Sequence, residues 1–521
     1  MELRVLKNLY NYPALFWLVI TFLVWWTGLG GRDLYLLPAL IFLLIYIYRI
    51  CKEKHFNVTI NLTKYFFGRK WLKIIFLVHI ALFIAITILK YYSFSWNVWD
   101  VGNFSNKLYN ISKGSFFSSY LGAHDWADHF NPSMSPLALF YLFLPSTHWV
   151  TVAKTVAYLT VPLLIQKICN ETFQSKEQAW NVTVIIGVSW MLFYAPALNS
   201  LYFEFQPSAL APPFILYAFL CFQRKFWLRF WVTMIVILGF KEHLGAVWIG
   251  FGCFMVLVTP NKKMGIFLIS GGIISIYLIM FHIMPYFRNY EESWSMPFGP
   301  FVDIPGKLIY LFKILMPLGF LPLIFWRFGI IAGPAIGVNM LSSNPKMYST
   351  GYHYDDISST LLMLAIVLIV SSGNLKLKLF EVKKSLQLLL LGWIVCIFGM
   401  LPHSPMRELY ASIPNTLHRD IRKELIEFDQ FSKGESIAVQ TSLGPQLNRT
   451  NILAITQDRR GECTEMRRDP LIAETKYLVF SKYLNHYLIK DLDQCLEKFN
   501  LSKDYEILHE YKNLYIYKKI N

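Results

Sequence analysis

The chain has 521 residues, of which 55% are hydrophobic and only 16% are charged, and its mean hydropathy is +0.40. Soluble globular proteins contain about 25% charged residues, so this composition excludes a single soluble domain. The formal net charge of +16 falls mostly in short loops between apolar runs, which indicates membrane orientation rather than a nucleic-acid partner.

Long apolar runs recur along most of the sequence. A transmembrane helix needs about 20 predominantly apolar residues. The sequence therefore predicts an α-helical polytopic membrane protein with about 13 transmembrane helices. The candidate spans are 14–30, 34–50, 73–90, 148–166, 180–198, 207–222, 228–240, 244–259, 264–284, 307–325, 328–341, 358–372 and 385–402.

Basic residues in short loops predict which way the helices cross, because cytoplasmic loops are rich in Lys and Arg. The 51–73 loop is the most basic, and the loops at 167–176, 224–229, 262–263 and 376–384 fall on the same side when the spans are threaded in order. We therefore expect a multi-pass protein of the cell (plasma or inner) membrane. Its N-terminus would be cytoplasmic and residues 403–521 extracytoplasmic.

Residues 403–521, called the tail below, differ in character from residues 1–402. Short β-like runs alternate with polar helical stretches, and 505–518 has the pattern of a hairpin. The sequence thus predicts a transmembrane domain of residues 1–402, GT-C-like in the resemblance described below, followed by a small soluble α/β domain. The tail has two cysteines, Cys463 and Cys495. They would form a disulfide in an oxidising compartment or remain free thiols.

The first outer loop, residues 91–147, carries two polar motifs. Asp100 follows closely after a predicted span, where partial desolvation raises the pKa of a carboxyl group. It would serve as a general base or bind a divalent cation, unless it only caps a helix. His124, Asp125, Asp128 and His129 lie close together in sequence. They would bind a metal or orient a phosphate-bearing substrate, or they are ordinary interfacial polar residues.

Three further outer segments hold ionisable residues. Glu204 stands in a strongly apolar setting, which favours a functional role over a side chain that reaches to the interface. Lys241 and Glu242 either neutralise each other or bring a cation to a phosphate and a carboxylate to a metal. His353 lies between Tyr352 and Tyr354, which suits a sugar or headgroup site and equally an interfacial aromatic belt.

The order of these motifs resembles that of a known membrane family. WDVGNF, ADHFNP, FEFQP with ALAPP, KEHLGA, MPLGFLPL, NMLSS with YHY, and the tail run SIAVQTSLGPQLNRTNIL are similar to motifs of the family catalogued as domain of unknown function 2079. The resemblance covers about residues 90–521. That family is grouped with the GT-C glycosyltransferases, so the resemblance implies a polyprenyl-phosphate-sugar donor and transfer on the extracytoplasmic side.

The resemblance also implies roles for individual residues. Asp100 matches the family's acidic residue in the first outer loop, which acts as base or metal-associated carboxylate, and Asp128 with His129 matches its second acidic motif. Two motifs depart from the family pattern. Glu204-Phe205-Gln206 stands for Asp-Phe-His, and Lys241-Glu242-His243 stands for Lys-Glu-Asp. The ligand set of any metal would change accordingly.

The function expected from the sequence is a lipid-linked sugar transferase with a glycan, lipid or protein acceptor. Asp100 would deprotonate the acceptor hydroxyl, while Lys241, with His353 or Arg288, would hold the phosphate of the donor. Asp128, His129, Glu204 and Glu242 would orient the sugar. A divalent cation, Mg²⁺ or Mn²⁺, would be held by residues from one set: Asp100, Asp128, Glu204 and Glu242.

A rival interpretation is a transporter or flippase of a lipid-linked or small polar substrate, because ionisable residues inside a membrane domain are expected there too. A catalytically inactive scaffold is a third. Transporters place their sites near the midplane, between repeats. A closed cavity at the outer face would therefore favour the enzyme, and a cavity open alternately to both sides would favour transport.

Overall fold

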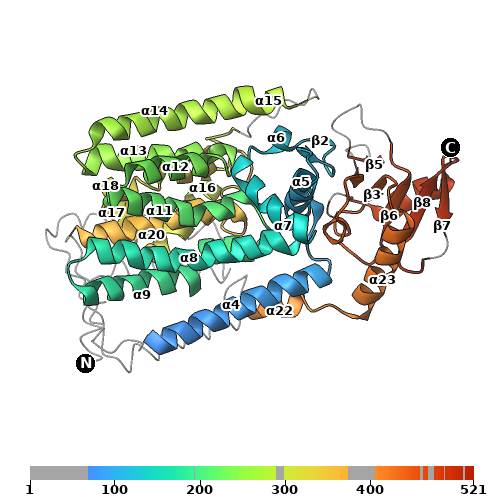
Figure 1. The fold of residues 1–521 in the computed structure, drawn as a ribbon, viewed down its shortest axis with the longest axis horizontal. Coiled ribbons are helices and arrows are strands. Elements are labelled where there is room, and N and C mark those ends of the chain that lie inside the picture. The colour runs from blue at the N-terminus through green and yellow to red at the C-terminus, as the bar shows by residue number, and fades with distance from the viewer. Residues whose placement is uncertain are drawn as a thin grey trace.

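A computed structural model describes residues 69–192, 194–288, 298–372, 405–457, 462–466, 474–485, 487, 489–508 and 511–520. The predicted spans 14–30, 34–50 and 385–402, and the predicted domain boundary at 402, lie outside these residues. Figure 1 shows long helices side by side at one end and a sheet domain at the other, with the first outer loop between them.

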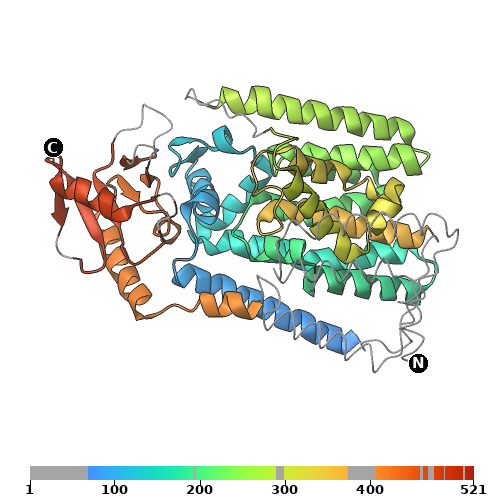
Figure 2. The same ribbon diagram turned by 180° about the vertical axis from the view of Figure 1, so that it is seen from behind.

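The helical bundle holds most of the described residues. Its longer helices run roughly parallel or antiparallel to one another, as both views show (Figures 1 and 2). Their bounds are α4 Arg69–Tyr92, α8 His148–Thr172, α9 Lys176–Leu192, α10 Ala195–Tyr202, α11 Ala211–Gln223, α12 Trp227–Leu238, α13 Gly245–Val258, α14 Lys262–Leu278, α15 Met284–Tyr286, α16 Ile304–Leu315, α17 Leu321–Ile324, α18 Trp326–Gly329, α19 Gly333–Leu341 and α20 Asp356–Ser371.

Short turns of 3₁₀ or π helix join several of these helices. They are η4 Pro207–Leu210 before α11, η5 Glu242–Leu244 before α13, η6 Ile279–Ile283 after α14, η7 Met316–Leu318 after α16 and η8 His353–Asp355 before α20. Helix α20 is the centre of the bundle, because 89% of the apolar stretch at 353–371 is buried, against 28% for the stretch at 262–286.

The structure supports a membrane protein but not the count of thirteen spans. Among the described residues, three helices are long and apolar enough to cross a membrane: His148–Thr172, Lys262–Tyr286 and His353–Ser371. A fourth is added if Ala195–Tyr202 and Pro207–Gln223 are counted as one broken span, in which the helix direction bends by 116°. The predicted span 180–198 is also divided, since α9 ends at Leu192 and α10 starts at Ala195.

The predicted spans 307–325 and 328–341 are wrong as continuous helices. The motif MPLGFLPL breaks the first, because Pro317 and Pro322 each begin a new turn and proline cannot continue a helix. Gly319 and Phe320 between them have φ angles of 59° and 56°, a left-handed conformation that ends a right-handed helix. The hydropathy of these segments therefore does not report single continuous helices.

Glycines allow α13 and α14 to pack with their backbones in contact. A Cβ atom on Gly252 would lie 2.5 Å from the carbonyl oxygen of Gly265, and one on Gly245 would lie 2.6 Å from that of Gly272. Small residues at such positions are typical of closely packed membrane helices. The contact between Gly245 and Gly272 lies at the first residue of α13, close after Lys241 and Glu242.

The first outer loop folds into small elements between the bundle and the tail. They are η2 Val98–Gly102, α5 Asn103–Ser112, α6 Asp125–Asp128, η3 Pro132–Leu137, α7 Ala138–Phe143 and the two-stranded sheet of β1 Phe117–Ser118 and β2 Ala123–His124. These elements bring Asp100, Asp128 and His129 to the end of the bundle that faces the tail.

The tail forms a six-stranded mixed sheet in the order β5-β4-β3-β6-β8-β7. Strands β4, β3 and β6 are parallel, and β5, β8 and β7 are antiparallel to their neighbours. The strands and the tail's other elements are β3 Ile437–Val439, β4 Ile452–Gln457, β5 Cys463–Glu465, β6 Tyr477–Phe480, β7 Tyr505–Leu508, β8 Tyr515–Lys519, α22 Pro405–Ala411, α23 Thr416–Phe431, α24 Leu492–Leu501 and η9 Gly444–Gln446. The predicted α/β character and hairpin are confirmed.

Alternation along the strands explains why both faces of the sheet are covered. Ile437 and Val439 pack with α23, whereas Ala438 packs with α24 on the opposite face, as a period of two requires. A disulfide joins Cys463 on β5 to Cys495 on α24. Of the two alternatives left open by the sequence, the structure has the paired form.

We predict that Gly265→Ala will destabilise the protein, whereas Gly337→Ala will not. A Cβ on Gly265 would lie 2.7 Å from the oxygen of Gly252, but a Cβ on Gly337, within α19, meets nothing within 4 Å. Overpacking costs about 1–3 kcal/mol. Thermal unfolding in detergent should therefore show a lower midpoint for the first variant only, and equal midpoints would contradict the close contact of α13 with α14.

Candidate functional site

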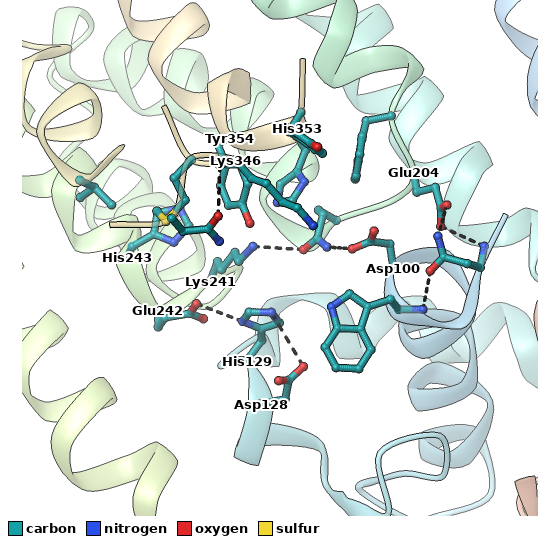
Figure 3. Close-up of a pocket in the computed structure, with 18 of the residues that line it drawn as sticks. Asp100, Asp128, His129, Glu204, Lys241, Glu242, His243, Lys346, His353 and Tyr354 are labelled. Carbon is teal, nitrogen blue, oxygen red and sulfur yellow. Dashed lines mark hydrogen bonds and ion pairs between the residues drawn. The ribbon is translucent and has the colours of Figure 1, made fainter. Parts of the chain in front are cut away.

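A cavity of about 400 Å³ opens at the end of the bundle beneath the tail. Most of the predicted site residues line it, from four separate segments: Asp100, Asp128, His129, Glu204, Lys241, Glu242 and His353. Figure 3 shows these side chains gathered around one space. The segments that the sequence placed on the outer side therefore meet at one site.

Asp100 lies inside a single π-helical turn, η2. Asn97 caps this turn, since its side-chain oxygen accepts a hydrogen bond of 2.8 Å from the backbone N–H of Trp99. The alternative interpretation of Asp100 as the helix cap is therefore wrong. Turns of this kind are rare and often occur at functional sites, because they present a side chain that a regular helix would direct elsewhere.

The tail holds this turn in place. The backbone N–H of Val98 donates to the carbonyl oxygen of Thr441 at 2.9 Å, and the hydroxyl of Tyr120 donates to that of Gly444 at 2.6 Å. A Cβ on Gly444 would lie 2.2 Å from a Val98 methyl carbon, so only glycine allows this approach. The tail run TSLGPQ is thus part of the support for Asp100.

A chain of hydrogen bonds links Asp100 to Lys241, as Figure 3 shows. The Nζ of Lys241 donates to Oε1 of Gln206 at 3.1 Å, and Nε2 of Gln206 donates to Oδ1 of Asp100. Burial raises the pKa of Asp100 to about 6, and the charge of Lys241 and the bond from Gln206 oppose this rise. The carboxyl group therefore changes its protonation state close to neutral pH, as a general base requires.

A second polar group in the lining of the cavity consists of His129, Glu242 and Asp128. The Nδ1 of His129 lies 3.0 Å from Oε1 of Glu242, and its Nε2 lies 3.8 Å from Oδ2 of Asp128. The backbone N–H of Phe130 also donates to Glu242, at 3.4 Å. Glu242 and Asp128 thus lie on either side of one imidazole, which fixes the ring between two carboxylates.

Glu204 occupies the break between α10 and η4. Its carboxylate accepts hydrogen bonds from the amide of Asn97 at 2.5 Å and from two backbone N–H groups, those of Asn97 at 3.3 Å and Val101 at 3.4 Å. Glu204 is therefore bonded to both ends of the turn that carries Asp100. Its role in this geometry is to fix the turn.

Two lysines, one buried and one partly buried, stabilise the same break. The Nζ of Lys154 on α8 donates to the carbonyl oxygens of Ser200, Phe203 and Glu204 at 2.7, 2.9 and 3.3 Å. The Nζ of Lys90 on α4 donates to the carbonyl of Tyr202 at 3.0 Å and forms an ion pair with Glu408 at 2.7 Å. The last carbonyls of a helix have no partner within it, so these lysines supply the missing donors.

The sequence matches the profile of the predicted membrane protein family DUF2079 over residues 90–462. The chain belongs to this family. Two solved structures have a similar arrangement: ArnT from Cupriavidus metallidurans bound to undecaprenyl phosphate, at a TM-score of 0.53, 11% identity and coverage of 87% of this chain and 99% of that chain, and the same protein in the apo state, at 0.49, 12%, 84% and 97%. A comparison with curated proteins finds no match. At these identities the likeness concerns the fold alone.

Some of the predicted residues of this DUF2079 chain lie away from the cavity. Arg288 is outside its lining, and its Nε donates to the carbonyl of Ala127 at 2.7 Å, which supports α6. Asp125 forms an ion pair of 2.9 Å with the buried Lys107. His124 stacks on Phe287 at 4.1 Å between ring centroids. Of the HDWADH cluster, only Asp128 and His129 reach the cavity.

Other residues line the cavity but were missed by the sequence analysis or given no separate role there. Gln206 was noted only as a departure from a family pattern. Lys346 lines the cavity, and its Nζ donates to the hydroxyl of Tyr487 at 2.7 Å, so the tail contributes to the lining itself. The remaining members are Asn97, Trp99, Phe203, His243, Met280, Val338, Asn344, Met347, Tyr352 and Tyr354. No periodicity or local motif marks Tyr487, because its place depends on how the tail docks.

Several of the side chains that were predicted to bind a metal ion are already bonded to other residues. Among the described residues, no group of three or more His, Cys, Asp or Glu side chains is arranged to hold a metal ion. Asp100 is bonded to Gln206, and Glu242 is bonded to His129. The four predicted ligands therefore do not form one site in this structure, and the cation itself stays a prediction.

We predict that Lys154→Met will destabilise this DUF2079 protein strongly, whereas Lys167→Met on the same helix will have little effect. The first change removes the donor for three carbonyls, and a buried unsatisfied polar group costs about 1–3 kcal/mol. Lys167 is exposed, and such surface changes stay within about 0.5 kcal/mol. Unfolding midpoints in detergent measure the difference, and a stable Lys154→Met protein would contradict the role of this lysine at the break.

Proposed function

We propose that this protein is a membrane glycosyltransferase that moves a sugar from a polyprenyl-phosphate donor to an extracytoplasmic acceptor. The main support is the position of Asp100, whose carboxylate lines a cavity at the end of the bundle and is bonded through Gln206 to Lys241. The fold likeness to ArnT, a GT-C enzyme whose structure was solved with undecaprenyl phosphate, and the motif resemblance to GT-C proteins agree with this proposal.

In the proposed reaction, the oxygen of the acceptor hydroxyl attacks the anomeric carbon of the donor sugar. Asp100 takes the proton of that hydroxyl as the new carbon–oxygen bond forms. The bond between the anomeric carbon and the phosphate oxygen breaks at the same time, and the polyprenyl phosphate leaves with the bonding electrons. A single displacement of this kind inverts the anomeric configuration.

Two lysines are suited to the phosphate. Lys241 and Lys346 both line the cavity, and a cationic donor to a phosphate oxygen forms a stronger hydrogen bond than a neutral one. His353 adds a further polar group, because its side chain is buried and both ring nitrogens lack a hydrogen-bond partner among the described residues. In this proposal Asp128, His129 and Glu242 would contact or orient the sugar, and Glu204 would act on its orientation through the turn that carries Asp100.

The proposed sidedness rests on two observations. The basic loops assign the tail to the extracytoplasmic side, opposite to the Lys- and Arg-rich connections. The disulfide between Cys463 and Cys495 agrees with this side, because disulfides persist in oxidising compartments and are rare in the cytosol. The cavity beneath the tail would then receive its acceptor from outside the cell membrane.

We predict that Asp100→Asn will reduce sugar transfer by at least about 100-fold, since general-base catalysis typically contributes 10²–10⁴-fold. Membrane vesicles that contain the protein would be incubated with a panel of polyprenyl-phosphate sugars labelled in the sugar. Release of label from the lipid into a new glycoside gives the rate. Asn has nearly the shape of Asp but cannot take the proton.

Asp303→Asn is the matched control. Asp303 is an exposed helix cap whose side chain accepts a hydrogen bond from Gly306, and Asn preserves that bond, so transfer should remain at the wild-type rate. Full transfer by Asp100→Asn would remove this residue from the mechanism. Label that crosses the membrane still attached to its lipid, without any new glycoside, would indicate a flippase instead.

We predict that EDTA will leave transfer unchanged, because Asp100 is bonded to Gln206 and Glu242 to His129, and a cation would have to displace these bonds. The assay above would be repeated after chelation and again with added Mg²⁺ or Mn²⁺. A rate that falls on chelation and returns with either ion would contradict this expectation. It would also revive the predicted cation site at Asp100, Asp128, Glu204 and Glu242.

A further inference from the structure

Gln206 is a neutral side chain between an anion and a cation. It is buried, at 4% exposure, and lies between Asp100 and Lys241. Pro207 follows it, and the residue before a proline is restricted to extended backbone, which agrees with the φ of −131° and ψ of 145° at Gln206. The backbone is thus fixed by sequence, and the side chain makes no capping bond to η4.

The chemistry of the neighbours sets the direction of the amide. The ammonium group of Lys241 can only donate hydrogen bonds, so it must face the amide oxygen. The NH₂ group is then left for Asp100, whose ionised carboxylate can only accept. If the amide were turned around, its NH₂ group would face the ammonium group of Lys241 and its oxygen would face the carboxylate of Asp100. Two donors and two acceptors would then meet, so the amide has only one favourable orientation.

The two oxygens of Asp100 consequently differ. Oδ1 accepts the hydrogen bond from Gln206. Oδ2 accepts none from the described residues, and Asp100 lines the cavity. We propose, on the basis of the proposed function, that Gln206 is a positioning residue that holds Oδ1 so that Oδ2 alone is presented to the acceptor hydroxyl. Gln206 itself takes no proton and contacts the reaction only through Asp100.

Several titratable groups besides Lys241 surround Asp100 and are unchanged in the variants below. They come from α8, the segment after α6, the break before η4, the 342–352 loop and η8: Lys154, His129, Glu204, Lys346 and Tyr354. The bond from Gln206 favours the ionised form of Asp100 because it stabilises the negative charge. Loss of this bond should therefore raise the pKa of Asp100.

The test is an infrared pH titration of the full-length protein in liposomes with EDTA present, so that no cation competes with protons for Asp100. The carbonyl band of protonated Asp100 is identified as the one that Asp100→Asn lacks, and its wild-type midpoint is expected at about pH 6. Gln206→Met, of similar length but without a donor, should raise this midpoint by about one pH unit, a tenfold change in proton affinity. Gln206→His should return it toward the wild-type value, since neutral imidazole has one donor and one acceptor nitrogen.

Gln206→Glu provides a second test of the inference if the methionine variant does not fold. It retains the acceptor for Lys241 but replaces the donor with a second carboxylate, so the midpoint should rise here as well. Wild-type midpoints in the variants that fold would overturn the inference. The readout is independent of transfer. Shifted midpoints in a protein that transfers no sugar would contradict the proposed function while leaving the bond from Gln206 to Asp100 established.

Discussion

Backbone carbonyls that are left unpaired by a broken helix inside an apolar bundle must find donors there. No water is available in hydrocarbon to bind them, and each unsatisfied group would cost several kcal/mol. Lys154 supplies the missing donor at the end of α10, where its ammonium group donates three hydrogen bonds to backbone carbonyls. Once the break is stable, its residues can leave the helical path, and Glu204 and Gln206 project into the cavity.

The other polar residues of the cavity also lie where helices are interrupted. Lys241 and Glu242 lie where α12 has ended and η5 leads into α13, and His353 begins the short turn before α20. The breaks lie near one end of the bundle, so their polar side chains converge. The glycine contacts of α13 with α14 hold one of these breaks, and the buried position of α20 holds another. A site of this kind combines rigid helices with irregular backbone only where the chain lines a cavity, as membrane proteins generally require.

The tail is a structural part of the site rather than an appended domain. The carbonyl of Thr441 accepts a hydrogen bond from Val98 of the Asp100 turn, Gly444 packs against Val98, and Glu204 binds the turn through Val101. Tyr487 meets Lys346 at the cavity itself. The boundary predicted at residue 402 stays a prediction, but the bonds between the tail and the Asp100 turn show that the tail is part of the support for the cavity.

Sequence reasoning located the ionisable residues of the cavity because Glu204 and Lys241 are unusual in apolar surroundings, and burial of charge without function is costly. It could not locate the bonds between them. Lys154 lies in an ordinary apolar span, and nothing near it in sequence reveals the carbonyls that it binds. The segments around MPLGFLPL were predicted as continuous spans because a hydropathy average does not register the effect of two prolines on helix geometry. Arg288 was assigned to the phosphate from its charge and side, yet it lies outside the cavity lining and donates to the carbonyl of Ala127.

The internal bonds of the cavity also determine which groups remain for a substrate. Glu204 binds the Asp100 turn, Glu242 binds His129, and Gln206 is bonded at both ends. These groups hold the cavity in shape before any ligand arrives, which is the preorganisation that electrostatic catalysis needs. Oδ2 of Asp100 and the ring of His353 are not engaged in this way by the described residues. The first is the proposed base and the second is a polar ring in the lining of the same cavity, so a ligand that joins them must carry a hydroxyl toward the first and a polar group toward the second. A sugar presented on a phosphate, with an acceptor hydroxyl beside it, meets both requirements.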